Sequence, residues 1–456
     1  MLIKTRRDFL RIGLGSIPTA ATIAAMGKLG ELNVFAAGSS NYQALVCVFL
    51  AGGNDGNNMV APLNTATQNY TTYATARQTL ALPQSQFLPI AAKNGDQYGL
   101  DSQMPEIQAL YQSGKAAIAV NVGMLVVPIP NAATYNSLSG GSSSLPVNLF
   151  SHSDQTTQWQ TTSPTETSPT GWGGRLADQM QSLNTGAQFP TVVTTSGLAA
   201  FCTGAQTLPS VVPPGGAVPV TGNGSDAARI NAFQQLLTFD NGLQLVQQAN
   251  GIVSRGAAYV NVLNGLLASA TPLQTQFPAG NPLAAQLNMV ARIIGVHAGL
   301  GLNRQIFFCS LDGFDTHGSQ ISIQTPLLQQ LSQALNAFDN ATVELGVAQQ
   351  VTSFTSSEFG RTLMANSSGG TDHAWGNHHL IVGGSVAGGD LYGTYPTLTL
   401  GNATYDATGR GSMIPGTSVD QYGATFAQWF GVAPANLPQI FPNIGNFTNN
   451  NLGFMG

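Results

Sequence analysis

ALVCVFLAGGNDGNN, residues 44–58, is the segment that says most about how this 456-residue chain folds. Residues 44–50 form a continuous apolar run, which is typical of a strand buried on both faces of a parallel sheet. Gly52 and Gly53 then permit a tight turn, and Asp55 follows that turn. Because ligands bind beyond the carboxyl ends of the strands in open α/β sheets, Asp55 stands where a functional carboxylate is expected.

Further apolar runs alternate with helical patterns along the rest of the chain. The strand-like runs are residues 117–122, 305–311, 350–354 and 380–382, and the clearest helical patterns are residues 282–300 and 325–345. Strands that alternate with helices indicate crossover connections and a parallel sheet. We therefore predict an α/β fold in which helices cover both faces of a mostly parallel central sheet.

Nothing in the pattern divides the chain after residue 36. No internal repeat and no linker is visible, and large α/β enzymes of this length form one unit. Two stretches lack periodicity and are expected to be long loops, near residues 161–171 and 208–226. We expect a single domain over residues 37–456.

The N-terminus carries TRRDFLR, residues 5–11, which is the full pattern of a twin-arginine export signal. The weakly apolar residues 12–26 that follow are fewer than the roughly 18 to 20 that a membrane-spanning helix needs, so a membrane anchor is the weaker alternative. We predict a signal peptide over residues 1–36 that is cleaved near Ala36 or Ala37. The twin-arginine translocase would be a partner during export, and the mature protein, without a stable membrane span, would be periplasmic or extracellular.

The charge of the chain excludes some classes of partner. Only 8% of the residues are charged, against roughly 25% in an ordinary soluble domain. Removal of residues 1–36 would leave 10 basic and 18 acidic side chains, a formal net charge of −8. A chain this acidic lacks the basic surface that nucleic acid or an anionic membrane requires.

Five of the six histidines lie in three short segments that also contain carboxylates. These segments are SHSD (residues 151–154), DTH (residues 315–317) and DHAWGNHH (residues 372–379). Imidazole and carboxylate together suit a borderline divalent ion such as zinc better than calcium or magnesium, which favour oxygen alone. The pattern therefore predicts bound divalent metal, with zinc as the first candidate.

The predicted topology would bring the candidate ligands to one rim of the sheet. If the strands are parallel neighbours, their carboxyl ends meet at one edge. The ligands expected there are Asp55, Asp315, His317, Asp372, His373 and His378. Six ligands are enough for two ions.

Several motifs together resemble the exported DUF1501 family, a domain of unknown function. They are the leader TRRDFLR, LAGGNDGNN (residues 50–58), FDTH (residues 314–317), SEFGRT (residues 357–362) and DHAWGNH (residues 372–378). That family is similar to the alkaline phosphatase and sulfatase superfamily, whose members hydrolyse phosphate or sulfate esters with two metals and a Ser, Thr or modified Cys nucleophile. The resemblance implies an alkaline-phosphatase-like three-layer sandwich, and a small anionic ester as the substrate.

The resemblance also implies roles for the ligands. Asp55 would match the ligand after the first strand, Asp315 and His317 the Asp/His pair, Asp372 with His373 the Asp-His dipeptide, and His378 the closing histidine. This chain departs from the superfamily at two points. The superfamily's Asp/His pair is spaced more widely, and Glu358 stands at a strand end where the dipeptide is often found.

Ser151 is the candidate nucleophile, because it is similar in position to a Ser-His element before a helix. The helix dipole and a nearby ion would both favour its alkoxide. However, Ser151 followed by Asp154 also resembles a helix cap. Ser153 is an alternative nucleophile, and His152 is a partner for the leaving group or for a metal. Arg361 would be an extra donor to the substrate.

Some of these residues also fit purely structural roles. The segment around Asp55 can be a tight turn only, and Asp315 with His317 can be a surface hydrogen bond. Three functions agree with the pattern: a metal-dependent hydrolase, a metal-stabilised but catalytically silent exported protein that acts in binding or assembly, and a metal-dependent transferase or isomerase.

Overall fold

The computed structural model describes residues 41–139, 141–217, 227–238 and 243–456. The chain divides into two units, Met1–Tyr42 and Gln43–Gly456, and the elements below belong to the second. The predicted signal peptide over residues 1–36, with its twin-arginine motif, lies outside the described residues.

Nine strands form the main sheet within the described residues. They are β1 (Gln43–Ala51), β5 (Ala116–Gly123), β6 (Val192–Thr194), β7 (Ser210–Val211), β8 (Arg304–Asp312), β9 (Val351–Ser356), β10 (Asn377–Gly383), β11 (Leu391–Tyr392) and β12 (Thr417–Ser418). The order is β11-β5-β10-β9-β1-β8-β6-β7, and β12 pairs with β5. β1 lies in the centre, parallel to both β8 and β9.

One strand runs against the others. β10 is antiparallel to β5 and to β9, whereas the remaining pairs are parallel, so the prediction of a parallel strand at residues 380–382 was wrong. The reason is the connection: residues 357–376 contain no helix, and a parallel return needs a crossover of a dozen or more residues that is usually helical. An antiparallel strand begins where its parallel neighbours end, so the start of β10 still lies at their carboxyl edge.

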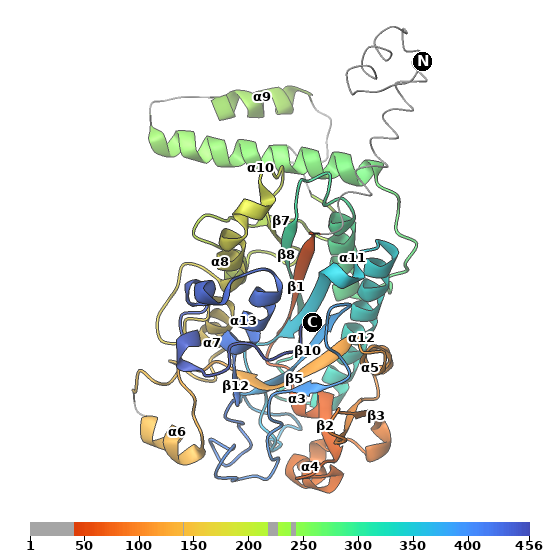
Figure 1. Ribbon diagram of the computed structural model, residues 1–456, viewed down its shortest axis with the longest axis vertical. Coiled ribbons are helices and arrows are strands. Elements are labelled where there is room, and N and C mark those ends of the chain that lie inside the picture. The colour runs from red at the N-terminus through yellow and green to blue at the C-terminus, as the bar shows by residue number, and fades with distance from the viewer. Residues whose placement is uncertain (1–40, 140, 218–226, 239–242) are drawn as a thin grey trace, which may run out of the picture. The chain divides into compact units, whose positions relative to one another are not determined.

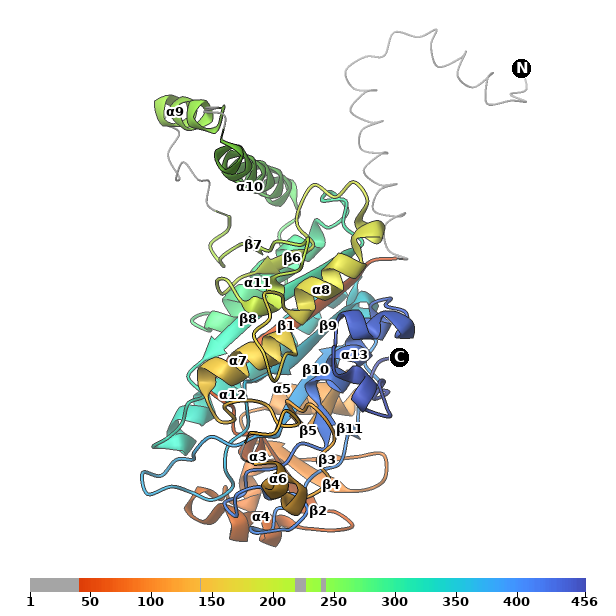
Figure 2. The same ribbon diagram turned by 90° about the vertical axis from the view of Figure 1, so that its left-hand side faces the viewer.

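Helices cover both faces of this sheet (Figures 1 and 2). One face carries α7 (His152–Thr161), α8 (Trp172–Gln179) and α13 (Val419–Trp429), and the other carries α5 (Pro105–Gln112), α11 (Pro282–Gly295) and α12 (Gln320–Glu344). Alternate β1 residues Leu45, Cys47 and Phe49 join the core cluster that includes α7, α8 and α13. The predicted α/β architecture is thereby confirmed.

The remaining elements lie outside these three layers. A small antiparallel sheet has the order β2 (Val60–Asn64), β4 (Gln97–Asp101), β3 (Phe87–Ala91). The short helices α3 (Gly56–Met59), α4 (Tyr70–Arg77) and α6 (Ala132–Leu138), and the pair α9 (Ala227–Thr238) and α10 (Gln244–Ser269), complete the α-helices of the described residues. Among the described residues, no helix is both long and apolar enough to cross a membrane.

Candidate metal centre

The turn after β1 brings the end of that strand against the loop that follows β8. Gly52 and Gly53 have φ angles of 116° and 80°, which L side chains rarely adopt. A Cβ on Gly52 would lie 2.3 Å from the backbone nitrogen of Asp315, and one on Gly53 would lie 2.4 Å from the ring of Phe359. The Gly52 amide also donates to Oε1 of Glu358 at 2.8 Å. The two glycines therefore permit the close contact on which the site is built.

Three imidazoles gather around the carboxylate of Asp315. His317 Nε2 lies 3.1 Å from Oδ1, His373 Nε2 lies 3.5 Å from Oδ1, and His152 Nε2 lies 3.5 Å from Oδ2. Ligand atoms of His152, Asp315 and His373 all lie within 4.8 Å of one another. The three histidines come from the start of α7, the loop after β8 and the loop between β9 and β10, which are distant in the sequence.

Two of the three imidazoles are oriented by an acceptor at the other nitrogen. His152 Nδ1 lies 2.9 Å from Oε1 of Glu358, and His373 Nδ1 lies 2.7 Å from the Phe150 carbonyl oxygen. His317 Nδ1 lies 3.6 Å from Oδ1 of Asp372. Carboxylate and carbonyl oxygens only accept, so in His152 and His373 the proton is placed on Nδ1 and the lone pair on Nε2. This is the orientation that metal-binding histidines have in proteins.

Two observations show that the donor set fits a divalent cation. Nε2 of His152 is buried and has no hydrogen-bond partner within the described residues. Nε2 of His317 and Nε2 of His373 lie 2.8 Å apart. This distance fits one hydrogen bond between the two rings or a cation shared by both nitrogens, and imidazole nitrogen is a ligand that zinc accepts. Burial lowers the pKa of His373, and the nearby Arg361 and His152 lower it further, so that this ring is neutral at pH 7 and available as a ligand.

Arg361 holds Asp315 in place, and its buried side chain cannot contact a substrate. Its side chain is buried and pairs with Oδ1 of Asp315. Its other donors reach the carbonyl oxygens of Gly52 at 2.6 Å, Gly53 at 2.9 Å and Thr371 at 2.9 Å. Burial raises the pKa of Asp315, but the hydrogen bond and the charge of Arg361, together with the charges of His317 and His152, outweigh this effect and lower the pKa. The predicted role of Arg361 as a donor to the substrate is therefore corrected: it is a positioning residue.

Asp372 lies behind His317, 3.6 Å from its Nδ1, and is itself held on both sides. Asn366 Nδ2 donates to its Oδ1 at 3.3 Å, and Arg410 Nη1 contacts its Oδ2 at 2.7 Å. Burial raises the pKa of Asp372, but the bonds from Asn366 and Arg410 outweigh this effect and lower it. Asp372 is thus a carboxylate behind a histidine, which differs from the direct ligand that the sequence suggested.

Asp55 is placed in a different set of contacts. Its Oδ1 accepts from the backbone of Asn57 at 3.0 Å and of Asn58 at 3.4 Å, where it caps α3. Its Oδ2 pairs with Arg77 and accepts from Gln320. Both carboxylate oxygens of Asp55 have partners in a fully buried network, so Asp55 is not part of the candidate site. The turn interpretation fits its position better.

The buried pair of Asp55 and Arg77 leads to a prediction about stability. Arg77→Met would leave the Asp55 carboxylate buried and unpaired, which we expect to lower the free energy of unfolding by about 3 kcal/mol. Urea unfolding measures this. The control is Arg410→Met, which removes a solvent-exposed pair with Asp372 and should change stability by less than about 1 kcal/mol. Equal effects of the two substitutions would contradict the interpretation.

His378 also lies apart from the cluster. Its ring is buried, and Nδ1 accepts a hydrogen bond from the Asn121 amide at 3.0 Å. Burial lowers its pKa to about 3, so it is neutral, and it packs on Tyr395 with ring centroids 4.8 Å apart. Because the lone pair on Nδ1 already accepts this hydrogen bond, His378 stabilises the fold and is not a ligand in the candidate site. Its neighbour His379 packs against Trp159.

Ser151 stands at the N-cap of α7, between two residues that contact the cluster. Phe150 accepts from His373, and His152 faces Asp315. Ser151 makes no side-chain cap bond; its Oγ instead donates to Oδ2 of Asp154 at 2.5 Å and lies 3.2 Å from Oγ of Ser153. The helix position that the sequence suggested is confirmed, while the contact of Ser151 differs from a standard cap.

Two contributors had little or no signal in the sequence. Phe150 has a φ of 73°, unusual for a residue with a side chain, and this backbone carries the carbonyl that orients His373. Arg410 lies far along the chain in a stretch without a motif. Both act through contacts that only the folded chain reveals.

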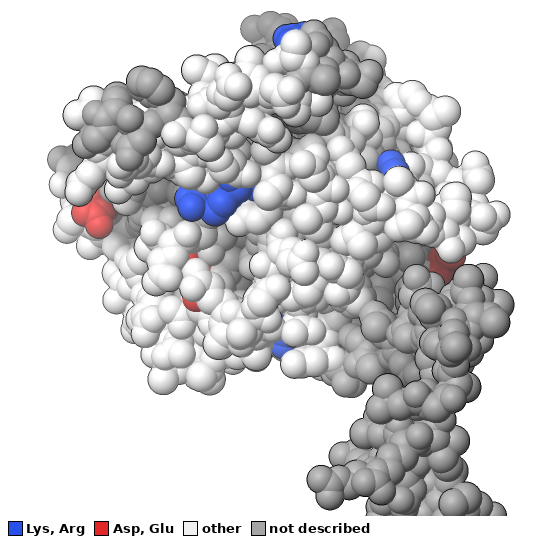
Figure 3. Space-filling model, turned by 90° about the horizontal axis from the view of Figure 1, so that it is seen from above, with Lys and Arg blue, Asp and Glu red and all other residues white. Residues whose placement is uncertain are grey.

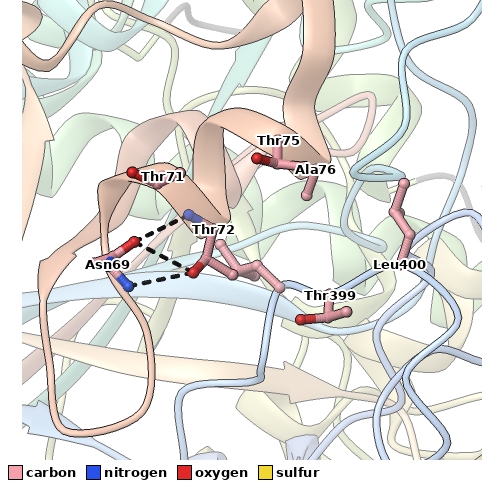
Figure 4. A pocket seen from close by; sticks show the side chains of 8 residues that line it. Asn69, Thr71, Thr72, Thr75, Ala76, Thr399 and Leu400 are labelled. Carbon is pink, nitrogen blue, oxygen red and sulfur yellow. Dashed lines mark hydrogen bonds between the residues drawn. The ribbon is translucent and has the colours of Figure 1, made fainter.

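A pocket of about 640 Å³ lies away from this cluster, between α4 and residues 398–400 (Figure 4). It is lined by Asn69, Thr71, Thr72, Thr75, Ala76, Leu398, Thr399 and Leu400. Asn69 and Thr72 cap α4 and hydrogen-bond to each other there. No histidine, cysteine or carboxylate lines this pocket, so it is not a candidate metal centre.

The chain belongs to the DUF1501 family, described as a protein of unknown function, whose profile matches residues 42–408. No curated protein matches it. The lipoteichoic acid synthase LtaP from Listeria monocytogenes is 8% identical, with a TM-score of 0.37 and coverage of 92% of this chain and 78% of that chain. The PsFucS1 sulfatase from Pseudoalteromonas sp. is 10% identical, with a TM-score of 0.32 and coverage of 93% and 74%.

A mutant of the alkaline phosphatase PafA is 12% identical to this chain, with a TM-score of 0.27 and coverage of 70% of this chain and 64% of that chain. A sulfatase and an alkaline phosphatase are thus among the solved structures that are similar to this chain. These likenesses assign no activity to it.

Proposed function

Starting from membership of a family of unknown function, we propose that this chain is an exported metal-dependent hydrolase of phosphate or sulfate esters. The proposed ligands of a divalent ion are Nε2 of His152, His317 and His373 and the carboxylate of Asp315. The observation that supports this proposal is the convergence of three imidazoles on one carboxylate, two of them with Nδ1 bonded to an acceptor. Zinc is the first candidate because it accepts mixed nitrogen and oxygen ligands in a four-coordinate site.

A single ion accounts for this ligand set. The earlier inventory of two ions needed Asp55 and His378, and both have other contacts in the structure. A second ion would have to use Asp372 and Nδ1 of His317, which lie 3.6 Å apart. In the one-ion arrangement Asp372 instead lies behind His317, while Glu358 orients His152.

The charges around the cluster favour an anionic substrate. A bound divalent ion supplies a Lewis acid and positive charge to an ester oxygen. The Arg410 side chain is 44% exposed and stands beside the cluster through its pair with Asp372, so a substrate can reach it. Arg361 remains on Asp315 and keeps that carboxylate ionised and aimed at the three imidazoles.

Ser151 is the proposed attacking group. It lies at the N-terminus of α7, where the helix dipole favours negative charge on its oxygen. Its neighbours Phe150 and His152 both contact the cluster, so the serine is held next to the proposed ligands. Attack by Oγ would form a covalent ester with the transferred group and release the alcohol of the substrate, and water would then cleave that ester.

A catalytically silent, metal-stabilised protein is the second candidate, and one observation favours it. Ser151 Oγ donates to Asp154, and this bond lowers the pKa of the Asp154 carboxyl. A carboxylate with a lowered pKa is a poor base for removing the serine proton. In this alternative the ion would stabilise the native fold and the protein would act in binding or assembly.

Metal analysis and an ester panel together test the proposal. Elemental analysis of the purified exported protein is expected to find a divalent metal close to one equivalent per chain, and absence of metal would contradict both candidates. Turnover of an aryl phosphate, phosphonate or sulfate ester that depends on this metal separates the hydrolase from the silent protein.

Export by the twin-arginine route is a further prediction. Arg6→Lys combined with Arg7→Lys should hold an uncleaved precursor in the cytoplasm, because this pathway depends on the arginine pair. Cell fractionation and immunoblotting measure it. The control, Lys4→Arg with Lys28→Arg, changes two other basic residues of the leader and should leave export intact. Normal export of the Arg6/Arg7 double variant would refute the route.

A further inference from the structure

Three buried glutamines lie in α7, the helix that begins with His152. Charged side chains are sparse in this protein, and Figure 3 shows few of them on one face of the molecule. The glutamines of α7 are Gln155, Gln158 and Gln160. Because a buried amide costs free energy unless its oxygen and nitrogen have partners, the partners of each glutamine indicate its role.

Gln155 hydrogen-bonds back to the residue that precedes the N-cap of the helix. Its Oε1 accepts from the Phe150 amide nitrogen at 2.6 Å. The side chain is fully buried, and its Nε2 has no hydrogen-bond partner within the described residues. An unpartnered buried amide nitrogen is costly, so an apolar side chain would suit this position better if filling space were its only role. The bond through Oε1 is therefore what Gln155 contributes.

Phe150 has a backbone conformation that needs such support. Its φ is 73°, which residues with a side chain rarely adopt. An apolar residue before an N-cap often packs against the fourth residue of the helix. Here that fourth residue is Gln155, which bonds to the Phe150 backbone instead. The hydrogen bond to Gln155 thus stabilises the unusual backbone of Phe150.

The backbone of Phe150 in turn orients the candidate metal centre. Its carbonyl oxygen lies 2.7 Å from Nδ1 of His373, whose Nε2 faces Asp315. Two residues further along the chain, His152 places its Nε2 3.5 Å from Oδ2 of Asp315. A shift in the Phe150 backbone would therefore move both the acceptor behind His373 and the start of the helix that carries His152.

We propose that Gln155 is a positioning residue of the candidate metal centre and acts through the backbone of Phe150. The contacts run from Oε1 of Gln155 to the Phe150 amide, and from the Phe150 carbonyl to Nδ1 of His373. Residues behind a metal ligand contribute to metal affinity because they fix the orientation of its ring. This proposal rests on the metal site of the proposed function, and binding measurements test it without any assumption about the ester.

The Zn²⁺ affinity of the metal-free protein, measured by competition with a chelating indicator, tests this proposal. Gln155→Met keeps the length of the side chain and removes the acceptor, so we expect the dissociation constant for Zn²⁺ to rise by about tenfold or more. Gln155→Glu keeps an acceptor oxygen, and burial favours the neutral form of its carboxyl. The dissociation constant of Gln155→Glu should stay within about threefold of the wild-type value.

The matched control is Gln160→Met. Gln160 is buried in the same helix, and its Oε1 accepts from the amide nitrogen of another phenylalanine, Phe201, at 3.2 Å. Gln160→Met therefore loses an equivalent hydrogen bond outside the cluster and should bind Zn²⁺ as the wild-type protein does. Without metal, Gln155→Met and Gln160→Met should have similar melting temperatures. Zn²⁺ should raise the melting temperature of Gln160→Met more, because it binds that variant more tightly.

The outcomes separate this proposal from the proposed function. Zn²⁺ affinity in Gln155→Met equal to that of the wild-type protein would overturn the positioning role alone. So would an equal loss of affinity in Gln160→Met, or a failure of Gln155→Glu to retain affinity. If Gln155→Met does not fold, Gln155→Asn withdraws the same amide by one methylene and should weaken binding in the same direction. A wild-type protein that binds no Zn²⁺ would contradict the metal centre itself, and this proposal with it.

Discussion

His373→Ala is expected to lower the divalent metal content of the purified protein by about tenfold or more. The Nε2 atom of His373 lies 3.5 Å from Asp315 and 2.8 Å from Nε2 of His317, so its loss opens the centre of the ligand set. Its Nδ1 bond to the Phe150 carbonyl would also be lost. Elemental analysis after dialysis measures the change.

The matched control is His297→Ala. His297 lies at the end of α11, where its Nδ1 lies 2.8 Å from the Ile294 carbonyl oxygen, and it takes no part in the cluster. Metal content should stay at the wild-type value in this variant. Chelation should also lower the melting temperature of the wild-type protein more than that of His373→Ala, because a ligand that binds only the native state stabilises it by mass action. Full metal content in His373→Ala would contradict the proposal that His373 is a metal ligand.

The strands that position this site could be predicted because burial on both faces leaves an unambiguous apolar run. The run at residues 44–50 is β1, and the run at residues 305–311 is β8, each extended by a residue at either end. The pairing direction of β10 could not be predicted in the same way. An apolar run has no polarity, and the absence of a helix between β9 and β10 was the only indication of an antiparallel return.

Asp315 and His317 were predicted as neighbours because residues two apart on extended backbone share a face, and the structure places their side chains 3.1 Å apart. His152 was harder to assign, because its place beside Asp315 depends on how the N-terminus of α7 packs across the sheet. Asp55 was misplaced for a related reason. The position of Arg77 in the fold, 22 residues further on, decides whether that carboxylate is free or paired.

The region between residues 208 and 282 was the least predictable. The long loop that we predict near residues 208–226 contains the two-residue strand β7 at Ser210–Val211, and residues 218–226 lie outside the described residues. The helices α9 and α10 that follow were not predicted. α10 does carry a regular pattern, but apart from Arg255 its polar positions are glutamine, asparagine and serine instead of charged residues. Low charge contrast between the two sides of a helix weakens the amphipathic signal on which prediction depends.

Ser151→Ala is expected to lower the metal-dependent ester turnover by roughly 10³-fold or more, while the metal content stays unchanged. Removal of a nucleophile leaves the ligand atoms in place, since Ser151 Oγ contacts Asp154 and Ser153 and none of the proposed ligands. Ser153→Ala is the matched control, because it removes the neighbouring hydroxyl that is bonded to the same carboxylate at 3.3 Å. We expect it to change turnover by less than about tenfold.

The combination of metal content and turnover separates the remaining alternatives. Loss of activity with intact metal in Ser151→Ala, together with an active Ser153→Ala, supports Oγ of Ser151 as the attacking atom. Unchanged activity in Ser151→Ala would keep the hydrolase and reject this nucleophile. A metal-loaded wild-type protein that cleaves no ester in a broad panel would contradict the hydrolase itself. The Ser151–Asp154 bond would explain such an inactive protein. It ties the serine hydroxyl to a carboxylate that is too weak a base to remove the serine proton.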